Sequence, residues 1–362
     1  MLDKKNLALL KKLSEVKGIS GNEKEVARIV HEEIKDVASR IEYDNLGSII
    51  AHRDGKNGEP LVMLAAHMDE VGFVVKSIEA SGLIRIHPIG GWYNHVILAE
   101  NFILKTREGK EFFAVTGAQP PHGMTAEQRS KVLEIKDMYL DIGVSDKKMA
   151  ESLGIRPGDT VTPYQEFRVL ADGKTLLGKA WDDRVGLAIG ISAFQELAKE
   201  PHAANLALVG TVQEEVGLRG AKTAASRVKP DIAIALDVTM SHDLPGSPDE
   251  PCKLGAGPAL SLMDGSVIAH RGLFELVEKI AKEHKIPYTY DLLTAGGTDS
   301  GEIHKTGDGV ITMTISLACR YFHSHVSLVN YDDFVNAVKL IVEVVKAIDQ
   351  KTLKQLRESK YQ

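Results

Sequence analysis

The hydrophobic positions in the first 70 residues change from a helical to an extended spacing. Charged residues interrupt the apolar ones at helical spacing over residues 1–16, which predicts an amphipathic helix. A second helix is predicted to follow Asn22, because Glu25 stands three residues later as a capping box requires. Apolar runs over residues 45–51 and 60–67 then predict two strands, and the second run suits a strand that is covered on both faces.

The middle of the chain has a different pattern. From about Glu70 to about Phe167, short segments of alternating apolar and polar residues are separated by Gly, Pro and charged turns. This pattern predicts a small all-β insertion, which we assign to residues 70–167. Residues 1–69 and 168–362 would then form the main, catalytic domain.

After the insertion, strand and helix patterns alternate. A helix is predicted over residues 184–200, and strands over 205–213, 230–238 and 309–318 are separated by further helices. A long C-terminal helix is predicted from about Tyr331 to Leu356. Because this alternation is typical of doubly wound sheets, we expect an α/β fold with a doubly wound mixed sheet and an inserted all-β domain.

Composition limits the class of protein and its partners. Of the 362 residues, 43% are apolar and 26% are charged, and no apolar run reaches the length of a membrane span. Charges interrupt the N-terminal segment too often for the core of a signal peptide. The net charge of −6, without a basic stripe, argues against a nucleic-acid partner. We therefore expect small or peptide substrates and no membrane association.

The two cysteines add information about location. Cys252 and Cys319 form no CxxC pair and no framework spacing, so neither a disulfide scaffold nor a thiolate metal site is indicated. This usage predicts a cytoplasmic protein.

Polar residues end or follow several apolar runs of the main domain. In an open α/β sheet, ligands bind beyond the carboxyl ends of the strands, so these polar residues are candidates for one shared site. The candidates are His67, Asp69, Asp182, Asp183, Glu214, Glu215, Asp237, His323 and His325.

The chemistry of this set favours a metal centre. Histidine and carboxylate ligands without cysteine suit a borderline divalent cation such as Zn, Co or Mn. One catalytic zinc with an open position needs fewer protein ligands than are available here. Two ions about 3.5–4 Å apart, bridged by one carboxylate, would use five side chains and share a water. The sequence therefore predicts a two-metal hydrolase.

The doubled glutamate suggests a separate role for each carboxylate. Neighbouring residues on a strand point to opposite faces, so we expect Glu215 to hold a metal ion and Glu214 to transfer the proton of the attacking water. Asp69, two residues after His67, is expected to accept a hydrogen bond from the far ring nitrogen and to fix the tautomer.

Six motifs occur in a characteristic order: "AAHMDEVGF", "AWDDRVG", "TVQEEVGLRGA", "ALDV", "GGTDSG" and "RYFHSH". With them, the chain resembles the M42 family of metallo-aminopeptidases over essentially its whole length. The resemblance implies a fold of the zinc-exopeptidase type and two divalent ions, Zn, Co or Mn, in each subunit. It also implies that a PDZ-like or barrel-like insertion drives assembly of a homo-oligomer, commonly a tetrahedral dodecamer.

The resemblance further assigns roles to the residues of these motifs. His67 and Asp237 would bind one metal ion, Glu215 and His323 the other, Asp182 would bridge them, and Glu214 would be the general base. The predicted activity is removal of the N-terminal residue of peptides by a hydroxide held between the two ions.

Several residues keep a second interpretation. His325 is the alternative ligand to His323, since a period of two would put both rings on one strand face. Asp183 is predicted to cap the helix that follows it. By resemblance, Asp299 in the glycine turn at 296–301 could meet the free amino terminus of a substrate. Three basic residues could bind an acidic side chain of the substrate or could form surface ion pairs: Arg219, Lys222 and Arg320.

Two other functions compete with the peptidase. A glycosidase needs two carboxylates on opposite sides of a sugar bond, about 5 Å or more apart, which adjacent glutamates fit poorly. A non-catalytic, metal-stabilised assembly subunit would leave Glu214 without a role. The sequence does not define the preferred N-terminal residue of the substrate.

Overall fold

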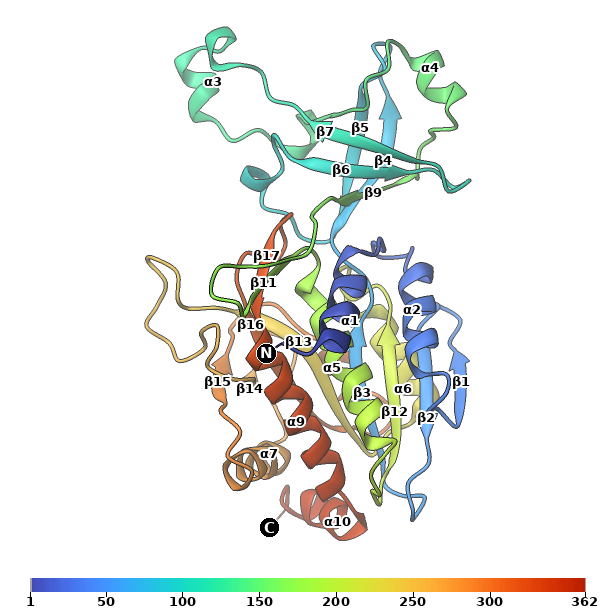
Figure 1. Ribbon diagram of the computed structural model, residues 1–362, viewed down its shortest axis with the longest axis vertical. Coiled ribbons are helices and arrows are strands. Elements are labelled where there is room, and N and C mark those ends of the chain that lie inside the picture. Colours follow the sequence, from blue (N-terminus) through green and yellow to red (C-terminus); the bar gives the residue numbers. More distant parts are fainter. Residues whose placement is uncertain (1, 362) are drawn as a thin grey trace.

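The main body of the protein is built on one mixed sheet of eight strands (Figure 1). The computed structural model describes residues 2–361. The strand order is β1 (Arg40–Tyr43), β2 (Ile49–Arg53), β12 (Asn205–Thr211), β3 (Leu61–His67), β13 (Ile232–Met240), β16 (Ile311–Cys319), β14 (Ala259–Met263) and β15 (Thr289–Leu292). The four middle strands, β12, β3, β13 and β16, are parallel, whereas β2 on one side and β14 and β15 on the other run against them.

Helices cover both faces of this sheet, which explains why the central strands are apolar throughout. The larger core packs on one face against α1 (Lys4–Glu15), α2 (Lys24–Ile34), α5 (Trp181–Leu197), α7 (Arg271–Glu283), α9 (Tyr331–Ala347) and α10 (Gln350–Glu358). A smaller core on the other face packs against α6 (Arg219–Val228) and α8 (Ser300–Ile303). Helix α5 is apolar on nearly all sides because it lies between the sheet and α1, α2 and α9.

A closed six-stranded barrel forms a second body beside the sheet (Figure 1). Its strands, in order around the barrel, are β4 (Gly72–Ile78), β5 (Ile84–Ile89), β8 (Leu140–Asp141), β7 (Glu111–Thr116), β6 (Asn101–Lys105) and β9 (Thr160–Pro163). Phe73 and Phe102 pack edge to face in a core that is separate from the two cores of the sheet. The α/β class is therefore confirmed, and the β-rich segment that the sequence predicts contains a small closed barrel.

The remaining elements are short. The insertion also carries the helices α3 (Ala126–Ser130) and α4 (Lys147–Ser152) and the 3-10 turns η1 (Asn94–Val96), η2 (Pro121–Gly123) and η3 (Ile135–Asp137). A three-stranded sheet of β10 (Arg168–Val169), β11 (Thr175–Gly178) and β17 (Ser327–Asn330) lies between the barrel and α5.

Two local predictions are wrong. The C-terminal helix is not continuous, because Ile348 is extended and buried and Asp349 caps a second helix by accepting from the amide of Thr352. Asn22 does not cap α2 either. The cap position is Glu23, whose side chain makes no capping bond because it accepts from the amides of Gly21 and Gln213.

Candidate metal centre

The site begins where two neighbouring parallel strands separate. His67 is the last residue of β3 and lies in register with Thr211 of β12. Strands β3 and β13 are paired only as far as Ala65 and Ala235, and Asp237 lies two residues further along β13. Ligand atoms of His67, Asp237 and Glu214 lie within 4.8 Å of one another. The gap between the two strands therefore gathers three predicted site residues.

The start of α5 supplies two aspartates with different surroundings. Asp182 and Asp183 have non-helical backbone angles, although they belong to the first turn. The carboxylate of Asp183 accepts from the amide of Gly186 at 3.1 Å and from the amide of His67 at 3.2 Å. Asp183 is therefore a helix cap, as predicted, and it also fixes the end of β3. Asp182 is left free to face the histidines.

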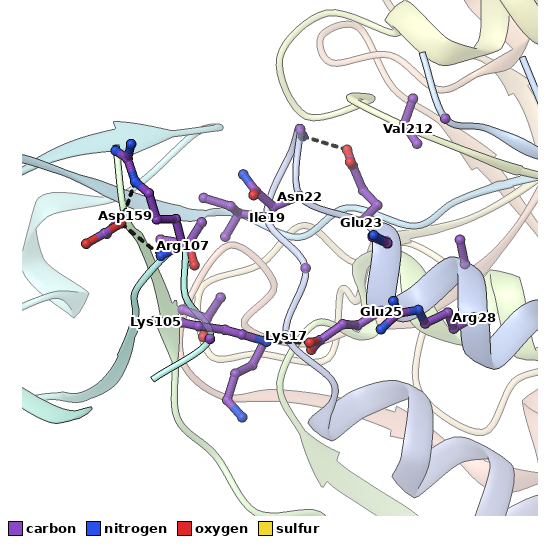
Figure 2. Close-up of a pocket in the computed structure, with 18 of the residues that line it drawn as sticks. Lys17, Ile19, Asn22, Glu23, Glu25, Arg28, Lys105, Arg107, Asp159 and Val212 are labelled. Carbon is purple, nitrogen blue, oxygen red and sulfur yellow. Dashed lines mark hydrogen bonds and ion pairs between the residues drawn. The ribbon is translucent and has the colours of Figure 1, made fainter. Parts of the chain in front are cut away.

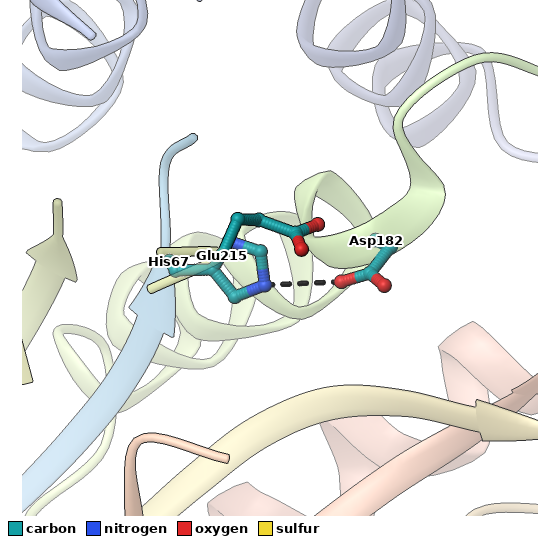
Figure 3. Close-up of side chains that lie close together, drawn as sticks. All are labelled: His67, Asp182 and Glu215. Atoms are coloured by element: carbon teal, nitrogen blue, oxygen red, sulfur yellow. Dashed lines mark hydrogen bonds and ion pairs between the residues drawn. The ribbon is translucent and has the colours of Figure 1, made fainter. Parts of the chain in front are cut away.

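Asp182 lies between the two histidines. Its Oδ1 atom is 3.0 Å from Nε2 of His67, and its Oδ2 atom is 3.2 Å from Nε2 of His323. Nε2 of His323 is also 3.3 Å from Oε2 of Glu215. Figure 3 shows His67, Asp182 and Glu215 converging from three different segments of the chain. The structure thus brings together all five predicted metal ligands.

The two rings are held in the same way. Nδ1 of His67 lies 3.0 Å from the backbone carbonyl of Asp69, and Nδ1 of His323 lies 2.8 Å from the carbonyl of Gly91. A carbonyl can only accept, so each Nδ1 carries the proton and a neutral ring directs its Nε2 lone pair toward the carboxylates. Such an arrangement is repulsive unless a proton or a cation lies between nitrogen and oxygen.

The predicted role of the Asp69 carboxylate is wrong in detail. It lies 3.6 Å from Nδ1 of His67, too far for a hydrogen bond, and the backbone carbonyl takes that place. The carboxylate accepts instead from the amides of Glu214 at 3.0 Å and Glu215 at 3.2 Å, and from the hydroxyl of Ser20 at 2.6 Å. Asp69 therefore orders the segment that carries both glutamates.

The two glutamates do not lie on a strand, in contrast to the prediction. Strand β12 ends at Thr211, and the following turn places Gln213 at a positive φ of 56°. The amides of Gly217 and Leu218 both donate to the carbonyl of Glu214. The two side chains therefore diverge because of a turn and not because of strand alternation.

His325 does not join the cluster. Residues 321–326 form an irregular loop in which Tyr321 and His323 have positive φ, so the expected alternation of a strand does not apply. The ring of His325 packs against Phe102 of the barrel, with centroids 4.5 Å apart, and lies 5.8 Å from Trp92. It joins the barrel to the main body while His323 faces Asp182.

The barrel reaches the site through two glycines. A side chain at Gly90 would collide with Val71 and would lie 3.4 Å from Cβ of Glu215, and one at Gly91 would lie 3.2 Å from the ring of His323. The close approach of this backbone to the site is therefore possible only without side chains.

The site carries an excess of negative charge. Burial, together with the nearby carboxylate of Asp182, raises the pKa of both Glu215 and Asp237 well above their ordinary range. Burial opposes protonation of His67, but the surrounding carboxylates outweigh it and raise the pKa of that ring. Oxygen Oε1 of Glu215 is buried and has no hydrogen-bond partner. Divalent cations would supply the missing positive charge and a partner for this oxygen.

The remaining candidates lie outside the cluster or are occupied. Asp299 is only 2% exposed; its Oδ2 atom accepts from the hydroxyl of Thr211, and its Oδ1 atom has no hydrogen-bond partner within residues 2–361. Arg320 forms two bonds of 2.7 Å with Asp243. Arg219 and Lys222 are exposed on α6. Sequence reasoning missed Ser20 and Glu23, because their contacts join segments that are far apart in the chain.

Comparison with known proteins agrees with this fold and site. A family model described as M42 glutamyl aminopeptidase matches residues 47–340. The glutamyl aminopeptidase of Lactococcus lactis is 34% identical over 96% of this chain and 98% of its own length. The TET aminopeptidase of a marine sediment archaeon of the Thaumarchaeota superposes with a TM-score of 0.94 at 36% identity, covering 97% of this chain and 99% of that one. A TET peptidase of Pyrococcus horikoshii, described as assembling into a tetrahedron or an octahedral shell, has a TM-score of 0.86 at 32% identity, with 95% and 100% covered.

These similarities first define the class of the protein, which is a hydrolase of the exopeptidase type. More closely, the chain belongs to the M42 family of aminopeptidases, whose members are generally metal-dependent and remove residues from the N-terminus of peptides. None of the helices within residues 2–361 is long and apolar enough to cross a membrane.

Proposed function

We propose that the protein removes single residues from the N-terminus of peptides at a centre of two divalent cations, Zn, Co or Mn. The observation that carries this proposal is the position of Asp182, whose two oxygens each face the Nε2 atom of a different histidine. His67 and Asp237 would hold one cation, His323 and Glu215 the other, and Asp182 both. The cations, when bound, would lower the pKa of a water molecule and polarise the scissile carbonyl.

The chain itself supplies the proton transfer. Oε2 of Glu214 lies 3.9 Å from Nε2 of His67. The carboxylate of Glu214 is therefore close to the proposed metal centre, although Asp182 lies nearer to the rings of both His67 and His323. Burial raises the pKa of Glu214 well above its ordinary value, and the carboxylate of Asp237 adds to this effect. A carboxylate of this kind can take a proton from the attacking water and return it to the leaving amine. Asp69 acts as a positioning residue for this glutamate.

Substrate would approach from the side of His323. The side chain of His323 is 33% exposed, whereas that of His67 is 2% exposed. One rim of the site is therefore open to a peptide, and the other is closed by the sheet. The free N-terminus of the peptide would then bind on the open side, beside His323.

We further propose that the insertion, residues 70–167, drives assembly into a homo-oligomer, with a tetrahedral dodecamer as one form. Phe113 and Tyr164 are exposed on the outside of the barrel and contact each other edge to face at 5.4 Å. An apolar patch on this face suits contact with another copy of the chain. Both cysteines are buried and unpaired, which is consistent with the proposed cytoplasmic location.

A peptide assay tests the proposed activity. Protein loaded with Zn²⁺, Co²⁺ or Mn²⁺ is incubated with peptides that begin with acidic, neutral, basic or aromatic residues, and free amino acids are measured. We expect release of the first residue, loss of activity in EDTA and recovery when the cation is restored. If no metal-loaded sample released an amino acid from any peptide, the proposed function would be wrong.

A further inference from the structure

The segment between α1 and α2, residues 16–23, contacts the loop that follows β3. We call this segment the connector. The amide of Glu70 donates to the carbonyl of Gly18 at 3.0 Å, and the amide of Gly18 donates to Oε1 of Glu70 at 3.0 Å. Arg184, in the first turns of α5, donates to the same carbonyl at 3.2 Å. The connector is therefore anchored beside two of the segments that supply metal ligands.

Ser20 in the connector completes the hydrogen bonding of Asp69. Its hydroxyl donates to Oδ2 of Asp69 at 2.6 Å, and the Asp69 carboxylate also accepts from the amides of Glu214 and Glu215. Asp69 is fully buried, so the direction of its carboxylate depends on these three donors. Ser20 thus orients the carboxylate of Asp69, and this carboxylate in turn holds the backbone amides of Glu214 and Glu215.

Glu23 at the end of the connector holds the residue before Glu214. Its Oε1 atom accepts from the amide of Gln213 at 3.1 Å and from the amide of Gly21 at 2.7 Å. Gln213 has a φ of 56°, a left-handed conformation that is unfavourable for a residue with a side chain. The hydrogen bond from Glu23 compensates for this cost and keeps the turn in the form seen here.

The opposite side of the connector is open. It lines a cleft of about 920 Å³ between α2 and the barrel, to which Arg107 and Asp159 contribute from the barrel side (Figure 2). Gly21 and Asn22 are exposed on the connector. Packing from this side therefore does not hold Gly21 and Asn22 in place. Beyond the anchor at Gly18, the hydrogen bonds of Ser20 and Glu23 tie this end of the connector to the site.

We propose that Ser20 and Glu23 are positioning residues of the active site, which set the backbone of Glu214 and Glu215 through Asp69 and Gln213. This inference rests on the proposed function, because it gives the two glutamates their roles as base and metal ligand. The connector would thus position the two glutamates although it is distant from them in the sequence, since Glu23 and Gln213 are 190 positions apart. In this role the two residues act through Asp69 and Gln213 and not through contact with the substrate.

Two pairs of variants test the proposal in the full chain. Ser20→Ala and Glu23→Ala remove the contacts, whereas Ser20→Thr keeps a hydroxyl and Glu23→Gln keeps an acceptor oxygen. At saturating Co²⁺, we expect the alanine variants to lose about 10–100-fold in kcat with KM changed less than about threefold, as for groups that orient metal ligands. The two conservative variants should keep kcat within about threefold of the wild type.

A second readout does not depend on turnover. The absorption spectrum of bound Co²⁺ reports the geometry of its ligands, so it should change in Ser20→Ala and Glu23→Ala and stay close to that of the wild type in the conservative variants. Wild-type kcat and an unchanged spectrum in both alanine variants would overturn the proposal. An inactive wild-type protein would contradict the proposed function alone, because the Co²⁺ spectra would still decide whether the connector positions Glu215.

Discussion

Nε2 of His323 lies 3.2 Å from Oδ2 of Asp182, although the two residues are 141 positions apart and come from different segments of the main body. The other oxygen of this carboxylate faces His67 in the same manner at 3.0 Å. In a neutral ring each contact would join a nitrogen lone pair to a carboxylate oxygen, since backbone carbonyls occupy both Nδ1 positions. The pairing therefore needs positive charge, and this requirement leads to the predictions that follow.

The first prediction separates the two neighbouring histidines. His323→Ala should lower the bound metal from two ions to about one per subunit and abolish most of the activity, because a metal ligand is lost. His325→Phe should keep both ions, because the ring of His325 packs between Phe102 and Trp92. Metal content after dialysis is measured by mass spectrometry. Loss of metal in His325→Phe with retention in His323→Ala would reverse the assignment.

The second prediction concerns stability at acid pH. Burial lowers the pKa of His325 from 6.5 to about 4, so between these values the unfolded chain binds a proton that the folded protein does not. Stability of the wild type should fall as pH decreases from 6.5 to 4, by about 2–3 kcal/mol through this residue. His325→Phe lacks the titrating group and should lose less.

The measurement is the free energy of unfolding in urea for wild type and His325→Phe. Metal-free samples are compared at pH 7 and near pH 4.5, so that loss of metal at low pH affects neither protein. Other titrating groups are shared and cancel in the difference. A difference between the two proteins that is the same at both pH values would show that His325 does not titrate in this way.

The third prediction tests the proton carrier. Glu214→Gln keeps the size of the side chain and removes its basicity, so kcat should fall by about 10²–10⁴-fold. Both metal ions should remain, because Glu214 is not among the proposed ligands. Glu215→Gln is the matched control one position away and should lose metal as well as activity. A wild-type kcat in Glu214→Gln would exclude this residue as the base.

The fourth prediction concerns assembly. Phe113→Asp puts a charge on the exposed face of the barrel where Phe113 contacts Tyr164. Because burial of an unpaired charge in an apolar contact is unfavourable, the variant should form smaller particles than the wild type. Light scattering after size-exclusion chromatography measures the mass, and circular dichroism controls for folding. An unchanged mass would place the contact between subunits elsewhere.

The proposed metal ligands lie close together in the structure, and the sequence indicates them because each lies at a visible change of pattern. His67 ends a continuous apolar run and Asp182 precedes a helix, so both are recognisable without the structure. The turn that carries Glu214 is not recognisable in this way. It depends on Asp69, Ser20 and Glu23, whose hydrogen bonds are long-range and leave no local signal.

The errors in the fold have similar causes. The sequence pattern does not indicate strands β14 and β15, because both are short and β15 lies at the edge of the sheet with alternate residues exposed. The break between α9 and α10 was missed because helical periodicity continues across it, while burial of Ile348 and capping by Asp349 depend on the tertiary structure. In each case, contacts between distant segments decide the local conformation.

Two cations are proposed to share the carboxylate of Asp182. Anomalous diffraction at the absorption edge of the metal, from crystals grown with Zn²⁺ or Co²⁺, locates these cations. We expect two anomalous peaks in each subunit, one beside His67 and Asp237 and the other beside His323 and Glu215, with Asp182 between them. A single peak, or peaks away from Asp182, would contradict this proposal.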